Sequence, residues 1–226
     1  MKLHTDIRAI IFDLDNTLID RDAAMKKSFS HWLKMQGTID PDKVNRELDL
    51  VLQKDNSGYN DILLLCEWLI STYGSKHTKH NSSPKDTLRG IQEHAISHLQ
   101  PNPELLRLLE LLKQKYFLAI ATNGSHFIQC KKAEKAQLPQ IIDPARIYSS
   151  ESIGYSKPRP EFFDRVLLSM NYPAHHCIMV GDHYENDVES AKNSGLHTCW
   201  INSKKITGGK AADSIFTDIT DIAQWI

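Results

Sequence analysis

Two carboxylates stand two residues apart, directly after the first apolar segment of the sequence. Asp13 and Asp15 follow residues 7–12, which have the length and composition of a short buried strand. In an extended chain, residues i and i+2 point to the same side, so the two charges repel unless a cation lies nearby. A Mg²⁺ ion, which prefers oxygen ligands, would relieve that repulsion. The pair also suits a two-step displacement, in which one carboxylate attacks phosphorus and the other transfers protons. Taken alone, the same pattern is also typical of an acidic turn or a helix cap.

Three later groups of polar residues stand at predicted strand ends or shortly after them. Thr122 and Asn123 end an apolar segment, where a hydroxyl and backbone N–H groups could hold phosphoryl oxygens. Lys157 lies just before a predicted helix. At this position its ammonium could neutralise a phosphoryl group and an attacking carboxylate. Asp182 is placed as a metal ligand, and Asp187 as a supporting or occasional direct ligand. Each group also has an ordinary interpretation as a turn, a solvated lysine or a helix cap.

The elements that must position these residues alternate between strands and helices. We predict strands at residues 7–12, 117–121, 147–148, 177–180, 197–201 and 214–217, and helices at residues 104–115, 161–170, 188–193 and the C-terminus. Strands joined through helices form right-handed crossovers, which build a parallel sheet. The predicted fold class is therefore α/β, with a doubly wound, Rossmann-like core. In such a sheet, sites form at the carboxyl ends of the strands, where the polar residues above are found.

A stretch without strand pattern interrupts this alternation. Helical spacing of apolar residues predicts helices at residues 23–35, 41–53 and 60–73, followed by a polar linker at residues 75–84. We therefore expect an all-helical cap subdomain at residues 20–85, inserted into a catalytic core formed by residues 1–19 and 86–226.

Composition argues against several classes of protein. The 27 Lys and Arg residues nearly balance the 28 Asp and Glu residues, so no basic surplus points to nucleic acid. The longest apolar runs are too short to span a membrane, and the N-terminus lacks the apolar stretch of a signal peptide. The four cysteines are widely scattered, which favours reduced thiols over a disulfide or a zinc site. We expect a cytoplasmic monomer or homodimer that binds neither nucleic acid nor membranes.

Together, the order of an acid pair, a threonine, a lysine and a second acid pair resembles the haloacid dehalogenase superfamily. The resemblance is to its magnesium-dependent phosphatase branch with a small helical cap, and it covers essentially the whole chain. Residues 12–18 and 181–187 are the specific motifs, whereas the threonine and lysine motifs are weak alone. The acid at Asp15 argues against the dehalogenases themselves, which lack an acid at that position.

The resemblance also implies a role for each residue. Asp13 would be the nucleophile and Asp15 the general acid and base. Thr122 would bind the phosphoryl group together with Asn123, and Lys157 would orient and neutralise it. Mg²⁺ would be the cofactor, and its expected ligands are Asp13, the main-chain carbonyl of Asp15 and Asp182, with support from Asp187.

The expected function is hydrolysis of a small-molecule phosphate monoester through an aspartyl-phosphate, with a nucleoside monophosphate or a sugar or organic-acid phosphate as substrate. A sugar-phosphate mutase of the same superfamily and a non-catalytic binding domain on the same fold are the alternatives. Three basic residues of the cap, Arg21, Lys26 and Lys27, would either meet an anionic group of the substrate or form a solvated helix face.

Overall fold

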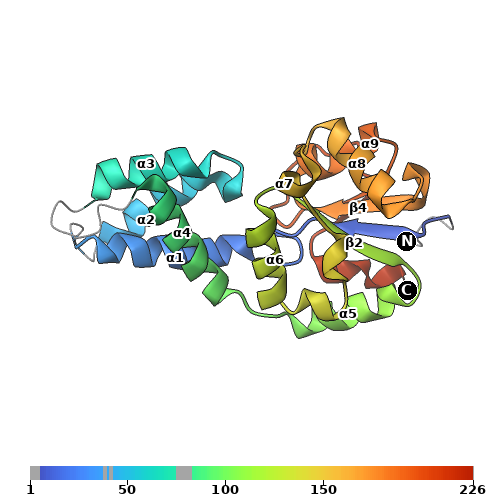
Figure 1. The fold of residues 1–226 in the computed structure, drawn as a ribbon, viewed down its shortest axis with the longest axis horizontal. Helices are drawn as coiled ribbons and strands as arrows, with labels where there is room; N and C mark the ends of the chain where they lie inside the picture. Colours follow the sequence, from blue (N-terminus) through green and yellow to red (C-terminus); the bar gives the residue numbers. More distant parts are fainter. Residues whose placement is uncertain (1–5, 38–39, 41–42, 75–82, 226) are drawn as a thin grey trace. The chain divides into compact units, whose positions relative to one another are not determined.

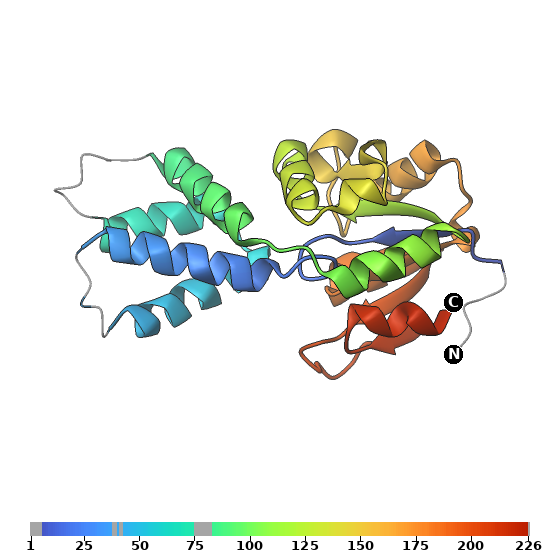
Figure 2. The same cartoon turned by 90° about the horizontal axis from the view of Figure 1, so that it is seen from below.

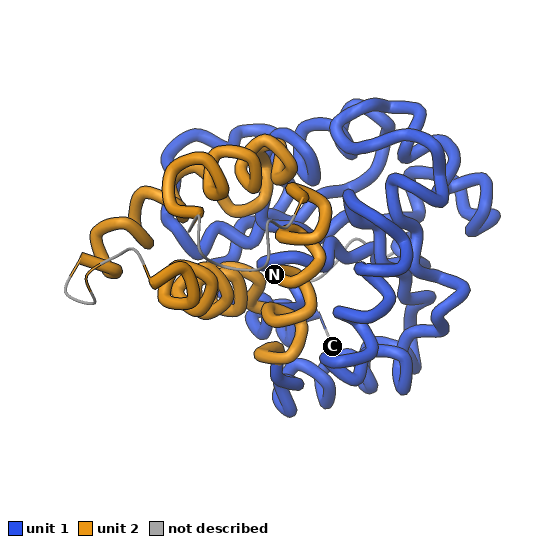
Figure 3. Tube along the Cα trace, turned by 60° about the vertical axis from the view of Figure 1, so that its left-hand side comes forward, with its two compact units in different colours: residues 1–19, 100–226 blue, residues 20–99 orange. Residues whose placement is uncertain are grey.

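Two compact units make up the computed structural model, which describes residues 6–37, 40, 43–74 and 83–225. The first unit consists of residues 1–19 and 100–226, and the second of residues 20–99 (Figure 3).

The first unit is built on a six-stranded parallel sheet with strand order β3-β2-β1-β4-β5-β6 (Figure 1). The strands are β1 (Ala9–Phe12), β2 (Phe117–Thr122), β3 (Ile147–Ser149), β4 (Cys177–Gly181), β5 (His197–Ile201) and β6 (Ser214–Phe216). Strand β1 lies between β2 and β4, so the chain builds the sheet outward from β1 in both directions. The doubly wound α/β fold predicted from the sequence is confirmed.

Helices cover both faces of this sheet, and every residue of β1 and β4 is buried for that reason. The helices are α5 (Pro103–Lys113), α6 (His126–Lys135), α7 (Ser150–Ile153), α8 (Pro160–Met170) and α9 (Ser190–Asn193), with a π-helical turn η6 (Tyr184–Glu189) and a C-terminal 3₁₀ segment η7 (Ile219–Trp225). On one face, Phe162, Phe163 and Val166 of α8 pack against alternate residues of the central strands. On the other face, α5 and η7 lie side by side (Figure 1 and Figure 2).

The second unit consists of helices α1 (Arg21–Met35), α2 (Val44–Asp55), α3 (Ile62–Tyr73) and α4 (Pro84–His98), with a 3₁₀ turn at Asn56–Gly58. Helix α1 packs against α2 and α4, and α3 packs against α4. Among the described residues of this unit there is no strand, as the sequence predicted. Three of the four helices have a side-chain cap, supplied by Asp20, Asp61 and Ser83.

Helix α4 differs from the expected domain organisation, because it belongs to the helical unit. The second boundary falls between Leu99 and Gln100, and not after residue 85. The physical reason is the apolar face of α4, where Ile91, Ala95 and Leu99 are buried among the helices of this unit. The Ser28 hydroxyl of α1 also donates to the Ile91 carbonyl at 2.7 Å. Most of the predicted linker lies outside the described residues.

Two further sequence predictions can be compared with the structure. All four cysteines are free thiols, and three of them are buried. Within the described ranges, no helix is both long enough and apolar enough to cross a membrane.

Candidate active site

Asp13 and Asp15 lie at the carboxyl end of the central strand β1. The Asp13 N–H donates to the Val180 carbonyl at 2.8 Å, which ties the start of this loop to strand β4. A tight turn follows, in which Leu18 and Ile19 both donate their N–H to the Leu14 carbonyl. Asn16, at φ 61°, takes the left-handed conformation that asparagine tolerates better than most residues. Asp13 is buried, while Asp15 is partly exposed.

The Lys157 ammonium contacts the end of β1, strand β2 and the turn η6. Its Nζ donates to Asp13 Oδ1 at 2.7 Å, to Asp187 Oδ1 at 2.6 Å and to the Ala121 carbonyl at 2.9 Å. An ammonium has three protons, so these three acceptors use all of them. Burial works to lower the pKa of Lys157, but Asp13 and Asp187 together outweigh that effect and raise it. Lys157 is therefore a buried cation held between the predicted nucleophile and a predicted metal-site residue.

The side chain of Asn123 positions the main chain of Lys157. Its Nδ2 donates to the Lys157 carbonyl and its Oδ1 accepts from the Lys157 N–H, both at 2.9 Å. We expected Asn123 to contact the substrate phosphate, yet its side-chain amide is engaged with Lys157. The phosphate contact was predicted through main-chain N–H groups, which these two side-chain bonds do not use, so it stays a prediction.

Three carboxylates converge beside this lysine. Asp13, Asp182 and Asp187 each offer an oxygen, and these oxygens lie within 4.8 Å of one another. Burial, opposed by Lys157 and assisted by the charge of Asp187, raises the pKa of Asp13 to about 7. Burial and the charge of Asp13 raise the pKa of Asp182 to about 8. A divalent cation with a preference for oxygen ligands would offset both effects, so this donor set fits Mg²⁺.

Gly181 is required by the close approach of Asp187. A Cβ atom at Gly181 would lie 2.3 Å from Asp187 Oδ2, which is closer than van der Waals contact permits. The same oxygen accepts from the His183 N–H at 3.0 Å. Gly181, the last residue of β4, therefore leaves room for the Asp187 carboxylate, which the His183 N–H helps to hold in place.

Two residues that the sequence analysis did not select also contact the site. Lys132 donates to both Asp15 oxygens, at 2.8 and 2.7 Å, and Gln129 donates to Asp15 Oδ2 at 3.0 Å. The same Gln129 nitrogen lies 2.6 Å from Thr122 Oγ1. Both residues belong to helix α6, which was not predicted because Gln129 and Ala133 are its only buried residues and give no apolar stripe. The signal that could have found them is a Gln and a Lys three residues apart after a strand-end threonine.

The basic residues of α1 differ in their surroundings. Arg21 is buried and forms a two-pronged ion pair with Asp55, with nitrogen–oxygen distances of 2.7 and 2.9 Å. Its guanidinium is thus engaged within the helical unit, which favours a structural role over binding of a substrate anion. Lys26 and Lys27 are exposed, as expected for a solvated helix face.

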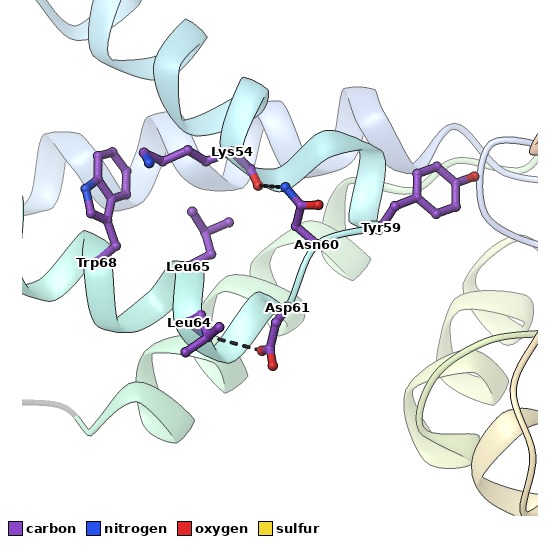
Figure 4. Close-up of a pocket in the computed structure, with 7 residues that line it drawn as sticks. All are labelled: Lys54, Tyr59, Asn60, Asp61, Leu64, Leu65 and Trp68. Carbon is purple, nitrogen blue, oxygen red and sulfur yellow. Dashed lines mark hydrogen bonds between the residues drawn. The ribbon is translucent and has the colours of Figure 1, made fainter.

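A separate cavity of about 520 Å³ lies within the helical unit, where α2 and α3 meet (Figure 4). Its lining residues are Lys54, Tyr59, Asn60, Asp61, Leu64, Leu65 and Trp68. The polar groups there are already engaged, because Asp61 caps α3, Asn60 donates to the Lys54 carbonyl and the Lys54 ammonium lies 4.7 Å from the centre of the Trp68 ring. The cavity contains none of the predicted catalytic or metal-site residues.

Comparison with known proteins identifies the family. The family model described as haloacid dehalogenase-like hydrolase matches residues 10–201. A glyceraldehyde 3-phosphate phosphatase from Pyrococcus furiosus is 26% identical over 241 residues, which cover 96% of this chain and 92% of that protein. The pyrimidine 5'-nucleotidase PynA from Streptococcus pneumoniae is 25% identical, over 85% of this chain and 83% of its own length. The fold is shared with the magnesium-bound putative hydrolase YfnB from Bacillus subtilis, with a TM-score of 0.77 and 20% identity over 96% of this chain and 97% of that one. The chain belongs to the haloacid dehalogenase-like hydrolases.

Proposed function

We propose that this protein is a magnesium-dependent phosphatase that hydrolyses a small-molecule phosphate monoester through an aspartyl-phosphate on Asp13. The observation that carries the proposal is the contact between the Lys157 ammonium and Asp13, beside two further carboxylates that suit a divalent cation. One relative named above is a glyceraldehyde 3-phosphate phosphatase, and another is a pyrimidine 5'-nucleotidase. They support a sugar or organic-acid phosphate or a nucleoside monophosphate as the substrate class.

In the first step, an oxygen of Asp13 attacks phosphorus and the phosphorus–oxygen bond to the leaving alcohol breaks. The departing oxygen takes a proton from Asp15, the partly exposed carboxyl two residues away. The Thr122 hydroxyl donates to a phosphoryl oxygen, and Lys157 offsets the negative charge gathered at the site.

In the second step, water attacks phosphorus and gives a proton to Asp15. The bond between phosphorus and the Asp13 oxygen then breaks, which releases inorganic phosphate and restores both carboxyl groups. The same residue therefore acts first as an acid and then as a base.

The metal would be held by Asp13, Asp182 and Asp187, together with the main-chain carbonyl of Asp15. When bound there, Mg²⁺ supplies positive charge against the phosphoryl oxygens. The raised pKa values of Asp13 and Asp182 are consistent with a cluster built for a cation, because neighbouring carboxylates with limited access to water are difficult to ionise without one.

The test is phosphate release from p-nitrophenyl phosphate, with Mg²⁺ and with a chelator. Asp13→Asn keeps the shape of the side chain and replaces the nucleophilic carboxylate by a neutral amide, so we expect it to lose at least about a thousandfold in kcat. Asp164→Asn, at an exposed position of α8, is the matched control and should retain wild-type activity. If the wild type with Mg²⁺ releases no more phosphate than Asp13→Asn, the proposed function is wrong.

A further inference from the structure

Helix α6 brings two side chains to the predicted acid and base, and neither has a role in the reaction described above. We propose that Lys132 and Gln129 are positioning residues, which hold the Asp15 carboxyl and the Thr122 hydroxyl in the orientations that the reaction needs. This inference rests on the proposed function, because it assigns residues that act through Asp15 and Thr122.

Lys132 fixes the carboxyl group of Asp15. Its ammonium contacts both oxygens, at 2.8 and 2.7 Å, although the two residues are 117 positions apart in the sequence. The lysine side chain is 15% exposed and the aspartate side chain 22% exposed, so bulk water screens the pair only in part. Gln129 adds a third contact, to Oδ2 at 3.0 Å. Together these contacts restrict the rotation of the Asp15 carboxyl group.

Gln129 also orients the Thr122 hydroxyl. The Asn123 carbonyl can only accept hydrogen bonds, and one terminal atom of Gln129 lies 2.9 Å from it and 3.0 Å from Asp15 Oδ2. That atom must be the nitrogen. The amide has two N–H protons for three acceptors, so one proton is shared between two of them. The Thr122 oxygen, 2.6 Å from the nitrogen, accepts from it and leaves its own proton for another acceptor.

The proton of Thr122 is thereby left for the substrate. The acceptor recorded for it inside the protein is the Asn123 carbonyl, which lies at a long 3.4 Å and already accepts from Gln129. Both Gln129 and Thr122 are 1% exposed, so bulk water does not compete for the hydroxyl. An incoming phosphoryl oxygen would meet a hydroxyl whose proton is already available.

A purely structural pair would behave differently from a positioning pair. If Lys132 only anchored α6, its loss would lower stability and would affect all substrates alike. If it acts through Asp15, its loss should matter most where the leaving oxygen needs a proton, which is the case for an alkyl phosphate and much less so for p-nitrophenyl phosphate. Misplacement of a reacting group by about 1 Å costs roughly a hundredfold, which sets the expected scale.

The first experiment is a double-mutant cycle of Lys132→Met and Asp15→Asn with both substrates. We expect Lys132→Met to lower kcat about 10–100-fold for the alkyl phosphate, with a smaller loss for the aryl phosphate and little change in KM. In the Asp15→Asn background, the same substitution should change kcat less than about twofold. Lys132→Arg, which can also reach both oxygens, should recover part of the loss. Lys135→Met, at an exposed position of the same helix, is the matched control.

The second experiment measures binding without turnover. Orthovanadate with Mg²⁺ serves as a phosphoryl analogue in calorimetric titrations of the wild type, Gln129→Leu and Gln129→Met. We expect both variants to weaken vanadate binding about tenfold, the scale of one lost hydrogen bond to a charged group. In a Thr122→Val background, substitution of Gln129 should weaken vanadate binding only a little further. Far-UV circular dichroism and melting curves establish that each variant is folded. If either Gln129→Leu or Gln129→Met fails to fold, the other still tests the role of Gln129.

The outcomes separate this inference from the proposed function. If wild-type phosphate release does not depend on Asp13, the proposed function fails. If it does depend on Asp13, but the effects of Lys132→Met and Asp15→Asn multiply, the positioning role of Lys132 is wrong. Wild-type vanadate affinity in both Gln129 variants would overturn the role assigned to Gln129.

Discussion

Replacement of Lys157 by methionine removes a buried cation that contacts both Asp13 and Asp187. Methionine preserves the length of the side chain, so the substitution tests charge more than packing. Loss of one partner from a buried ion pair costs about 3–5 kcal/mol in the free energy of unfolding, because the remaining charge is left without compensation. With a urea m value of about 2–3 kcal/mol/M, the midpoint of unfolding should fall by about 1–2.5 M.

The deficit should depend on pH and on metal in a defined direction. The pKa of Asp13 is already raised to about 7 by burial, and removal of the ammonium raises it further. A carboxyl whose pKa is raised in the folded state stabilises the fold at acidic pH, and that stability is lost as pH rises through the folded-state value. The deficit of Lys157→Met should therefore be largest at pH 8 without metal and smaller at pH 5. Millimolar Mg²⁺ at pH 8 should reduce it as well.

Urea unfolding followed by tryptophan fluorescence and by circular dichroism measures this deficit. Lys26→Met, at an exposed position of α1, is the matched control and should lie within about 0.5 kcal/mol of the wild type. Activity of Lys157→Met should also fall by at least about a hundredfold in kcat. A stability of Lys157→Met within about 1 kcal/mol of the wild type at pH 8, or a deficit that grows toward acidic pH, would refute this reading of the site.

Three further predictions concern other parts of the molecule. Arg21→Ala should lower the free energy of unfolding by about 3–5 kcal/mol in urea titrations, since it leaves the buried Asp55 carboxylate without its guanidinium partner. Asp55→Ala should cost less, since Arg21 keeps its contact with Asp22 at 3.4 Å, and the double substitution should cost less than the sum. The metal-free protein should lose stability as pH rises from about 4 to 8, because the pKa values of Asp13 and Asp182 are raised to about 7 and about 8, and the rise in melting temperature on addition of Mg²⁺ should be larger at pH 8 than at pH 5. Gly181→Ala would place its Cβ 2.3 Å from a carboxylate oxygen of the metal cluster, so calorimetry should show weaker Mg²⁺ binding; unchanged affinity would contradict the assigned ligand set.

Much of the architecture follows from local features of the chain. Short apolar segments separated by amphipathic helices predict a parallel sheet, and a parallel sheet collects the carboxyl ends of its strands at one edge. For that reason the sequence alone selected Asp13, Asp15, Thr122, Lys157 and Asp182 as one group. It also located the helical insertion, because residues 20–73 have helical periodicity and no strand pattern.

Other features depend on contacts between distant parts of the chain. The sequence did not predict α6, whose inward-facing residues are polar or small, and so it missed the contacts of Lys132 and Gln129 with Asp15. The partner of the Arg21 guanidinium, Asp55, likewise lies 34 residues away.

The sequence by itself determined which residue types stand at the strand ends, because periodicity and turn chemistry are local properties. Only the tertiary structure decided which side chain satisfies each buried polar group. The side chain of Asn123 holds the main chain of Lys157, a contact that the sequence did not predict, and α4, expected in the core, packs in the helical unit. Such pairings are set by distances between residues that may be separated by more than a hundred positions, as are Lys157 and Asp13, and no local pattern encodes those distances.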